Sequence, residues 1–183
     1  MPVTSANFVY ENQSAADQAK FDLALAYLQM SPAGAALVSS VVGLTINFVH
    51  GTENEDLNQY HADTGVLDWD PDMASMVYSA NGTVGTDSSA LSLAHEMAHR
   101  ADPNLTTEPD PEDVATAVQN QVASQLGEAS QANYTDNTLT VPVNNPTLHS
   151  SGTTWVEREP DGTTTTGGTY NPNQATPREA LIN

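Results

Sequence analysis

The spacing of apolar residues over the first fifty positions predicts two helices followed by a buried strand. Between residues 14 and 30, apolar side chains recur at the three- and four-residue intervals of a helix, and Ser14 can serve as its N-cap. A second helix is expected directly afterwards, because Ser31 can cap it and Pro32 suits its first position. The run Leu44 to Val49 is rich in β-branched and aromatic residues, which indicates a strand.

The middle of the chain combines polar stretches with short strand patterns. Residues 51–63 are polar and acidic, which predicts a loop. Two short strands are expected over residues 65–69 and 74–79, because turn-forming residues lie between them.

Two longer helices are predicted in the second half of the chain. Residues 87–101 combine a start that Asp87 or Ser88 can cap with one apolar face, and a further helix is expected from about Pro111 to Ala132. Beyond it, residues 139–158 indicate one or two short strands. The whole pattern predicts an α+β domain over residues 1–158, with helices packed on a small, twisted, mostly antiparallel sheet. Residues 159–183, rich in Thr, Gly, Pro and Asn, are expected to form a C-terminal tail.

Composition excludes several classes of partner and site. The 183 residues include no Cys, so disulfides and thiolate metal sites are ruled out. With 4 Lys and Arg against 23 Asp and Glu, the net charge of -19 makes binding to nucleic acid or anionic lipid implausible. The uncharged stretch Met30 to Val49 contains too many polar residues for a membrane span. The first residues lack the basic and apolar parts of a signal peptide. The protein is therefore expected to be cytoplasmic, exported by another route or cut from a longer protein, and its abrupt start favours the last of these.

One motif carries recognisable chemistry. Residues 95–99 read His95-Glu96-Met97-Ala98-His99, the H-E-x-x-H pattern, within a predicted helix. Positions i and i+4 share one face of a helix, so the two imidazoles can bind one metal ion. Zn²⁺ brings the pKa of a bound water toward neutrality, and Glu96 can accept its proton. The motif therefore predicts a zinc site in which His95 and His99 are ligands and Glu96 is the general base.

A catalytic zinc site needs a third protein ligand. Glu128 is the favoured candidate, because it falls on the helix predicted after the motif. Four other acids lie in the proline-rich loop or the first helical turn, where caps and solvated surface groups are also expected. These alternatives are Glu108, Asp110, Glu112 and Asp113.

The motif followed by a helical glutamate resembles the gluzincin group of zinc metallopeptidases. More narrowly, residues 31–135 are similar to the NleD-like effector metallopeptidases of bacterial secretion systems. The similarity rests on Ser31-Pro32-Ala33-Gly34, the strand Thr45 to Val49, the helix Ala94 to Arg100, and Gly127-Glu128-Ala129. Similar domains occur fused to type VI secretion spike proteins of the VgrG type, and this resemblance implies that the chain is the C-terminal part of a larger secreted protein. The resemblance implies a zincin-like fold, Zn²⁺, proteolysis, and delivery into a target cell or its periplasm.

Other roles are assigned less directly. A histidine ligand usually needs a hydrogen-bonding partner behind it, and Asp113 and Asp136 are candidates. A donor to the oxyanion is also needed, for which His149 and Tyr134 are candidates. In zincins an edge strand binds extended substrate, and residues 74–79 have the right order in the chain to do so.

Together these observations predict a zinc-dependent endopeptidase, secreted without a classical signal peptide, that acts on a protein or peptide in a target cell. Metal-bound water would attack the peptide carbonyl, and Glu96 would pass its proton to the leaving amine. Two alternatives belong to other classes. One is a non-catalytic cargo or adaptor domain of a secretion apparatus, and the other is an acidic decoy that mimics nucleic acid.

Overall fold

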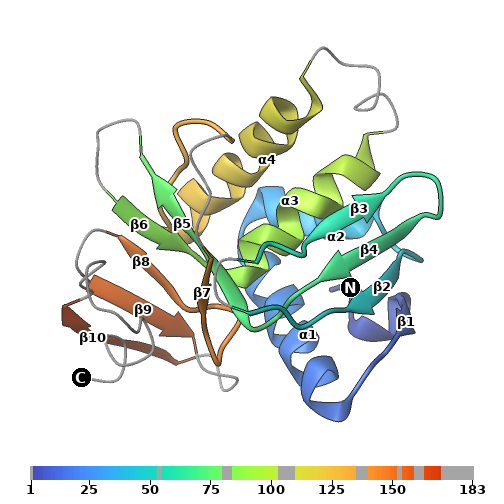
Figure 1. Cartoon of the computed structure of the whole chain (residues 1–183), viewed down its shortest axis with the longest axis horizontal. Coiled ribbons are helices and arrows are strands. Elements are labelled where there is room, and N and C mark those ends of the chain that lie inside the picture. Colours follow the sequence, from blue (N-terminus) through green and yellow to red (C-terminus); the bar gives the residue numbers. More distant parts are fainter. Residues whose placement is uncertain are drawn as a thin grey trace.

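Two sheets and four α-helices make up the described part of the chain (Figure 1). The structure is a computed structural model that describes residues 2–52, 55–79, 84–102, 110–134, 140–151, 154–158 and 163–169. The predicted α+β class is therefore confirmed.

The first sheet has four strands and mixed directions. Its order is β1 (Val9–Glu11), β2 (Thr45–Phe48), β4 (Val66–Trp69) and β3 (Gln59–His61). β2 runs parallel to both β1 and β4, whereas β3 is antiparallel to β4 and lies at an edge. β3 lies within residues 51–63, which are predicted to form a loop. The sequence does not indicate this strand, because a run of three polar and aromatic residues is too short to show a strand pattern.

The second sheet has six strands and is antiparallel throughout. Its order is β10 (Thr164–Thr169), β9 (Thr154–Arg158), β8 (His149–Ser151), β6 (Val84–Asp87), β5 (Met73–Tyr78) and β7 (Thr140–Pro142). β5 pairs with β6 on one side and β7 on the other, so the prediction that residues 74–79 form an edge strand is wrong. β10 lies within residues 159–183, the expected tail, and pairs with β9.

The helices begin where the predicted caps place them. α1 (Ala15–Leu28), α2 (Pro32–Ser40) and α3 (Ser89–Ala101) follow serines whose side chains accept a backbone N–H of the first turn. The capping residues are Ser14, Ser31 and Ser88.

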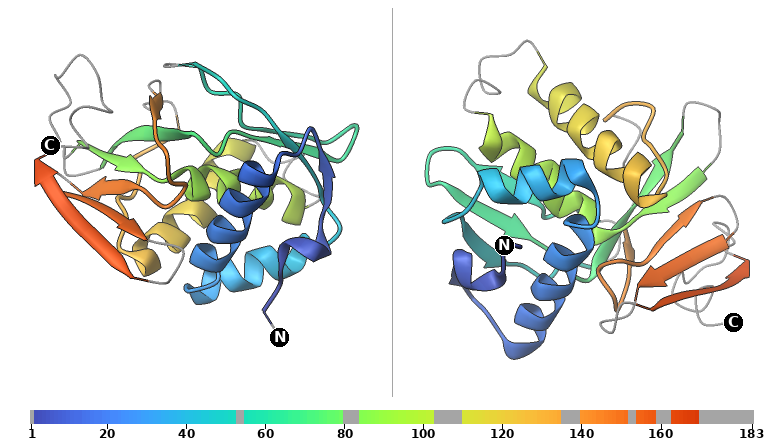
Figure 2. Two further views of the ribbon diagram at one scale, coloured as in Figure 1. Left: turned by 90° about the horizontal axis from the view of Figure 1, so that it is seen from below. Right: turned by 180° about the vertical axis from the view of Figure 1, so that it is seen from behind.

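α3 is the central helix of the fold. It contacts the other helices and the strands β3, β4 and β5, and residues 89–98 are all buried. Trp69 of β4 is fully buried and donates its indole N–H to the backbone oxygen of Ser89, 2.9 Å away. In Figure 2 the helices lie on one face of the four-stranded sheet. The helix that carries the H-E-x-x-H motif is thus held by packing around most of its surface.

α4 (Pro111–Leu126) packs against α3 and is shorter than predicted. Gly127 adopts a left-handed conformation with φ of 84°, and its N–H bonds to the backbone oxygen of Ala123. Glycine adopts this conformation without steric cost and commonly ends a helix. The helix therefore stops before Glu128.

No helix among the described residues has the length and apolarity to cross a bilayer.

Candidate metal centre

Two histidines one helical turn apart form the middle of the site. His95 and His99 lie on the same face of α3, and their Nε2 atoms are 3.2 Å apart. Their rings meet edge to face, with centroids 5.0 Å apart. His95 is buried and His99 is partly exposed, so the pair lies at the boundary between the core and solvent.

Glu112 supplies a third donor from the first turn of α4. Its Oε2 lies 3.1 Å from Nε2 of His95 and 3.3 Å from Nε2 of His99. Asp110 caps this helix by accepting the N–H of Asp113, and Pro111 fixes the first helical residue. Because α4 packs on α3, its start brings Glu112 to the two histidines.

The three donor atoms have the spacing that a tetrahedral metal site requires. Zinc bonds of about 2.0–2.1 Å separate two tetrahedral ligand atoms by about 3.3 Å. The separations among His95, His99 and Glu112 are 3.1, 3.2 and 3.3 Å. Two imidazole nitrogens and one carboxylate oxygen therefore form a group that can hold a metal ion.

The three groups shift one another's pKa values. Burial lowers the pKa of His95, but its hydrogen bond to Glu112 and the charges of Glu96 and Glu112 raise it more. Burial and the charge of His95 lower the pKa of His99. The hydrogen bond with His95 is the largest cause of a lowered pKa for Glu112. The site thus keeps an anionic carboxylate directed at two imidazole nitrogens, an arrangement that favours a cation between them.

Glu96 lies beside this group and is itself buried. Its Oε2 accepts the backbone N–H of Tyr60 in β3 at 2.7 Å, which ties the central residue of an edge strand to the motif. Burial raises the pKa of Glu96 to about 7, although the charge of His95 and the Tyr60 hydrogen bond oppose the shift. A cavity of about 260 Å³ is lined by Glu96, His99, Glu112, Tyr60 and Tyr134, among others, so these groups face a common space.

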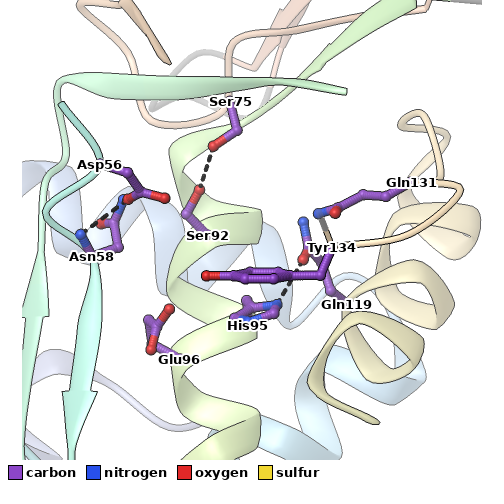
Figure 3. A pocket seen from close by; sticks show the side chains of 9 residues that line it. All are labelled: Asp56, Asn58, Ser75, Ser92, His95, Glu96, Gln119, Gln131 and Tyr134. Carbon is purple, nitrogen blue, oxygen red and sulfur yellow. Dashed lines mark hydrogen bonds between the residues drawn. The ribbon is translucent and has the colours of Figure 1, made fainter. Parts of the chain in front are cut away.

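Tyr134 also belongs to the site. Its ring stacks on His95, with centroids 5.3 Å apart and planes at 17°. Figure 3 shows the ring over His95, with the hydroxyl reaching across α3 toward the side on which Glu96 lies. Burial, followed by the charges of Glu112, Glu96 and Asp56, raises the pKa of Tyr134 to about 12. The hydroxyl therefore keeps its proton at neutral pH and can donate it in a hydrogen bond.

The structure places Glu128 away from the histidines. It follows Gly127, and its carboxylate accepts the N–H and the hydroxyl of Ser88, both at 2.8 Å, and the hydroxyl of Tyr27 at 2.7 Å. These bonds hold the N-terminal end of α3, two turns before His95. The predicted ligand thus becomes a helix-anchoring residue, and Glu112, one of the loop acids weighed as alternatives, lies where the third ligand is needed.

His149 lies with Glu128 rather than with the motif. Its Nδ1 is 2.8 Å from the backbone oxygen of Thr147 and 3.9 Å from Oε1 of Glu128, and its ring lies 6.2 Å from that of Tyr27. Of the two predicted oxyanion donors, the structure brings Tyr134 to His95 and leaves His149 beneath the start of α3.

Asp113, one of the two predicted partners behind the histidines, does not take that place. The carboxylate of Asp113 is not the group behind His95, where Nδ1 instead lies 3.0 Å from Oε1 of Gln119. Asp136 and Glu108 lie outside the described residues. The sequence offers no signal for Gln119, because its role depends on how α4 packs across α3.

A second cluster of metal-capable residues is formed by His50, Asp70 and Asp72. Lys20 makes an ion pair with Asp72, and Asp70 accepts the backbone N–H groups of Gly51 and Asp72. An ammonium group and two backbone donors therefore already occupy these acids.

Comparisons of the chain with family models, with curated proteins and with solved structures give no match.

Proposed function

We propose that this protein is a zinc-dependent endopeptidase with a zincin-like fold, in which His95, His99 and Glu112 bind the metal. One observation carries the proposal: the three donor atoms lie 3.1–3.3 Å apart, directly beside the glutamate of an H-E-x-x-H helix. Three protein ligands of this kind, with a position left for water or substrate, are typical of catalytic rather than structural zinc sites.

Zinc at this site would polarise the peptide carbonyl and bring the pKa of water toward neutrality. Glu96 would take a proton from the attacking water and deliver it to the leaving amine. It is buried and held by the N–H of Tyr60, so its position is fixed before substrate binds. The hydroxyl of Tyr134 would donate a hydrogen bond to the oxyanion that develops on the carbonyl oxygen.

The edge strand β3 is the element that best suits substrate binding. It lies at the end of the four-stranded sheet and contacts α3, and the N–H of Tyr60 on its outer side reaches Glu96. An extended peptide added along this edge would pass over Glu96. β3 thus takes the role that the sequence assigned to residues 74–79.

The proposal is tested by one matched pair of variants. Purified wild type should contain one zinc ion per chain and cleave an unstructured protein such as casein. Glu96→Gln should retain zinc and lose cleavage by at least about a hundredfold, because general-base catalysis contributes that much. Glu11→Gln, the same change on the exposed β1 strand, should behave as wild type. Wild type without zinc, or a fully active Glu96→Gln, would contradict the proposal.

The same experiment separates the two alternative functions. A nucleic-acid decoy should carry no stoichiometric zinc, and an adaptor should perform its role equally well with Glu96→Gln.

We also propose delivery of this domain into a target bacterial cell by a secretion system. Its support is the resemblance to effector metallopeptidases. The expected result is growth inhibition when wild type is expressed in the cytoplasm or periplasm of a target strain, and no inhibition by Glu96→Gln. Equal growth with both proteins in both compartments would argue against delivery as a toxin.

A further inference from the structure

The side of His95 opposite the metal position makes a buried chain of hydrogen bonds. Nδ1 of His95 lies 3.0 Å from Oε1 of Gln119, and Nε2 of Gln119 donates to Oδ2 of Asp87 at 3.1 Å. All three residues are nearly inaccessible to solvent, with exposures of 5%, 2% and 0%. These two hydrogen bonds therefore link β6, α4 and α3 in a region that solvent does not reach.

These hydrogen bonds determine which nitrogen of His95 carries hydrogen when metal is bound. Oδ2 of Asp87 accepts the amide N–H of Gln119, so the carbonyl oxygen of Gln119 faces His95. That oxygen only accepts, so it favours hydrogen on Nδ1 of the imidazole, whereas the Glu112 carboxylate accepts hydrogen on Nε2 as long as no cation lies between them. With hydrogen on Nδ1, the lone pair is on Nε2, the atom directed at His99 and Glu112.

We propose that Gln119, oriented by Asp87, is the positioning residue that holds His95 in the tautomer able to bind metal. Without it, the imidazole can carry hydrogen on Nε2, which blocks the ligand atom, and its ring can turn. Hydrogen-bonding partners behind a metal-binding histidine commonly change metal affinity 10–100-fold when removed. This inference rests on the proposed metal site but not on proteolysis.

The position of Asp87 allows these hydrogen bonds to hold His95 in place. Asp87 is the last residue of β6 and directly precedes Ser88, the N-cap of α3. His95 is therefore fixed by α3, which carries it, and by Gln119 on α4. Gln119 is in turn held by Asp87 at the start of α3. A neutral amide is also well suited to this place, because it adds no charge behind the ligand.

The first readout is the tautomer itself, measured in metal-free Glu112→Ala, which lacks the carboxylate that competes for hydrogen on Nε2. At pH 9, imidazole ¹⁵N shifts should show His95 of this variant with hydrogen on Nδ1. In the double variant Glu112→Ala/Gln119→Leu, a substantial population with hydrogen on Nε2 should appear. This measurement needs neither zinc nor substrate, so its outcome is independent of the proposed function.

The second readout is zinc affinity, measured by competition with a chelator. Gln119→Leu should bind zinc 10–100-fold more weakly than wild type. Gln121→Leu, the same change at an exposed position of α4, should be unchanged. Gln119→Glu keeps an acceptor for Nδ1 when its carboxyl group shares one proton with Asp87, and should retain wild-type affinity. A purely structural role would instead make both Gln119 variants weak.

Asp87 provides an independent check if Gln119→Leu fails to fold. Asp87→Ala frees the Gln119 amide to rotate and should weaken zinc binding, whereas Asp87→Asn still offers a carbonyl acceptor and should not. The proposal is overturned if His95 has hydrogen on Nε2 in metal-free Glu112→Ala. It is equally overturned if Gln119→Leu and Asp87→Ala, in folded form, bind zinc within twofold of wild type. Absence of zinc binding by wild type, with the tautomer as expected, would refute the metal site alone.

Discussion

Replacement by alanine should lower the stability of the protein at Glu128 and its zinc affinity at Glu112. Glu128 is buried and accepts three hydrogen bonds, from the hydroxyl of Tyr27 and from the N–H and hydroxyl of Ser88. Its replacement by alanine leaves these donors without their acceptor at the N-terminal end of α3. Glu112 instead has a side chain that is 37% exposed, and its partners are the two histidines.

The expected magnitudes follow from these environments. A hydrogen bond to a charged group contributes about 1.5–3 kcal/mol, and breaking a buried charged network costs about 3–5 kcal/mol. We therefore expect Glu128→Ala to lower the free energy of unfolding by about 3 kcal/mol. Glu112→Ala should change it by about 1 kcal/mol or less in metal-free protein, because its interactions are partly exposed.

The assay combines urea unfolding in the presence of a chelator with zinc analysis of the folded protein. Glu128→Ala should unfold at lower urea and still bind one zinc ion below its transition. Glu112→Ala should unfold like metal-free wild type and lose most of its zinc affinity. Loss of zinc without loss of stability in Glu128→Ala would instead show that Glu128 acts as the ligand predicted from the sequence.

Three further results are expected. Burial and the charge of Glu128 raise the pKa of Asp87 well above its usual value, so the folded state retains a proton that the unfolded chain loses above about pH 4. The free energy of unfolding should therefore fall as pH rises, by up to about 1.4 kcal/mol per pH unit. Measured by urea unfolding from pH 5 to 8, this fall should be shallower in Asp87→Asn, and an equal fall in both proteins would contradict the assignment to Asp87. Gly34→Ala should destabilise by about 2 kcal/mol in thermal unfolding, because the added carbon would lie 2.2 Å from the backbone oxygen of Leu28, and an unchanged midpoint would show that the backbone yields there. Tyr134→Phe preserves the stacked ring and should bind zinc normally while kcat falls roughly 100-fold; an unchanged kcat would remove the hydroxyl from the mechanism.

Local signals in the sequence predicted the helix starts well. Ser14, Ser31 and Ser88 each precede a helical pattern and cap it in the structure, since N-capping depends on neighbouring residues alone. The end of α4 was harder to predict. Apolar and polar residues continue past Gly127, and only its left-handed conformation shows that the helix stops there.

The candidate site was predictable where one helix determines it and unpredictable where packing does. The spacing of His95 and His99 fixes their common face, so the pair could be identified from the motif. Glu112 lies in the first turn of a helix, where an acid is equally well explained by interaction with the positive helix end. Its role, like that of Gln119, becomes visible only when α4 is placed across α3.

The most direct test of the metal centre is a crystal structure of the zinc-loaded protein, with anomalous data collected on both sides of the zinc absorption edge. We expect one strong peak at about 2.0–2.2 Å from Nε2 of His95, Nε2 of His99 and a carboxylate oxygen of Glu112. No peak at these three residues, or a peak bound by Glu128 in place of Glu112, would contradict this expectation.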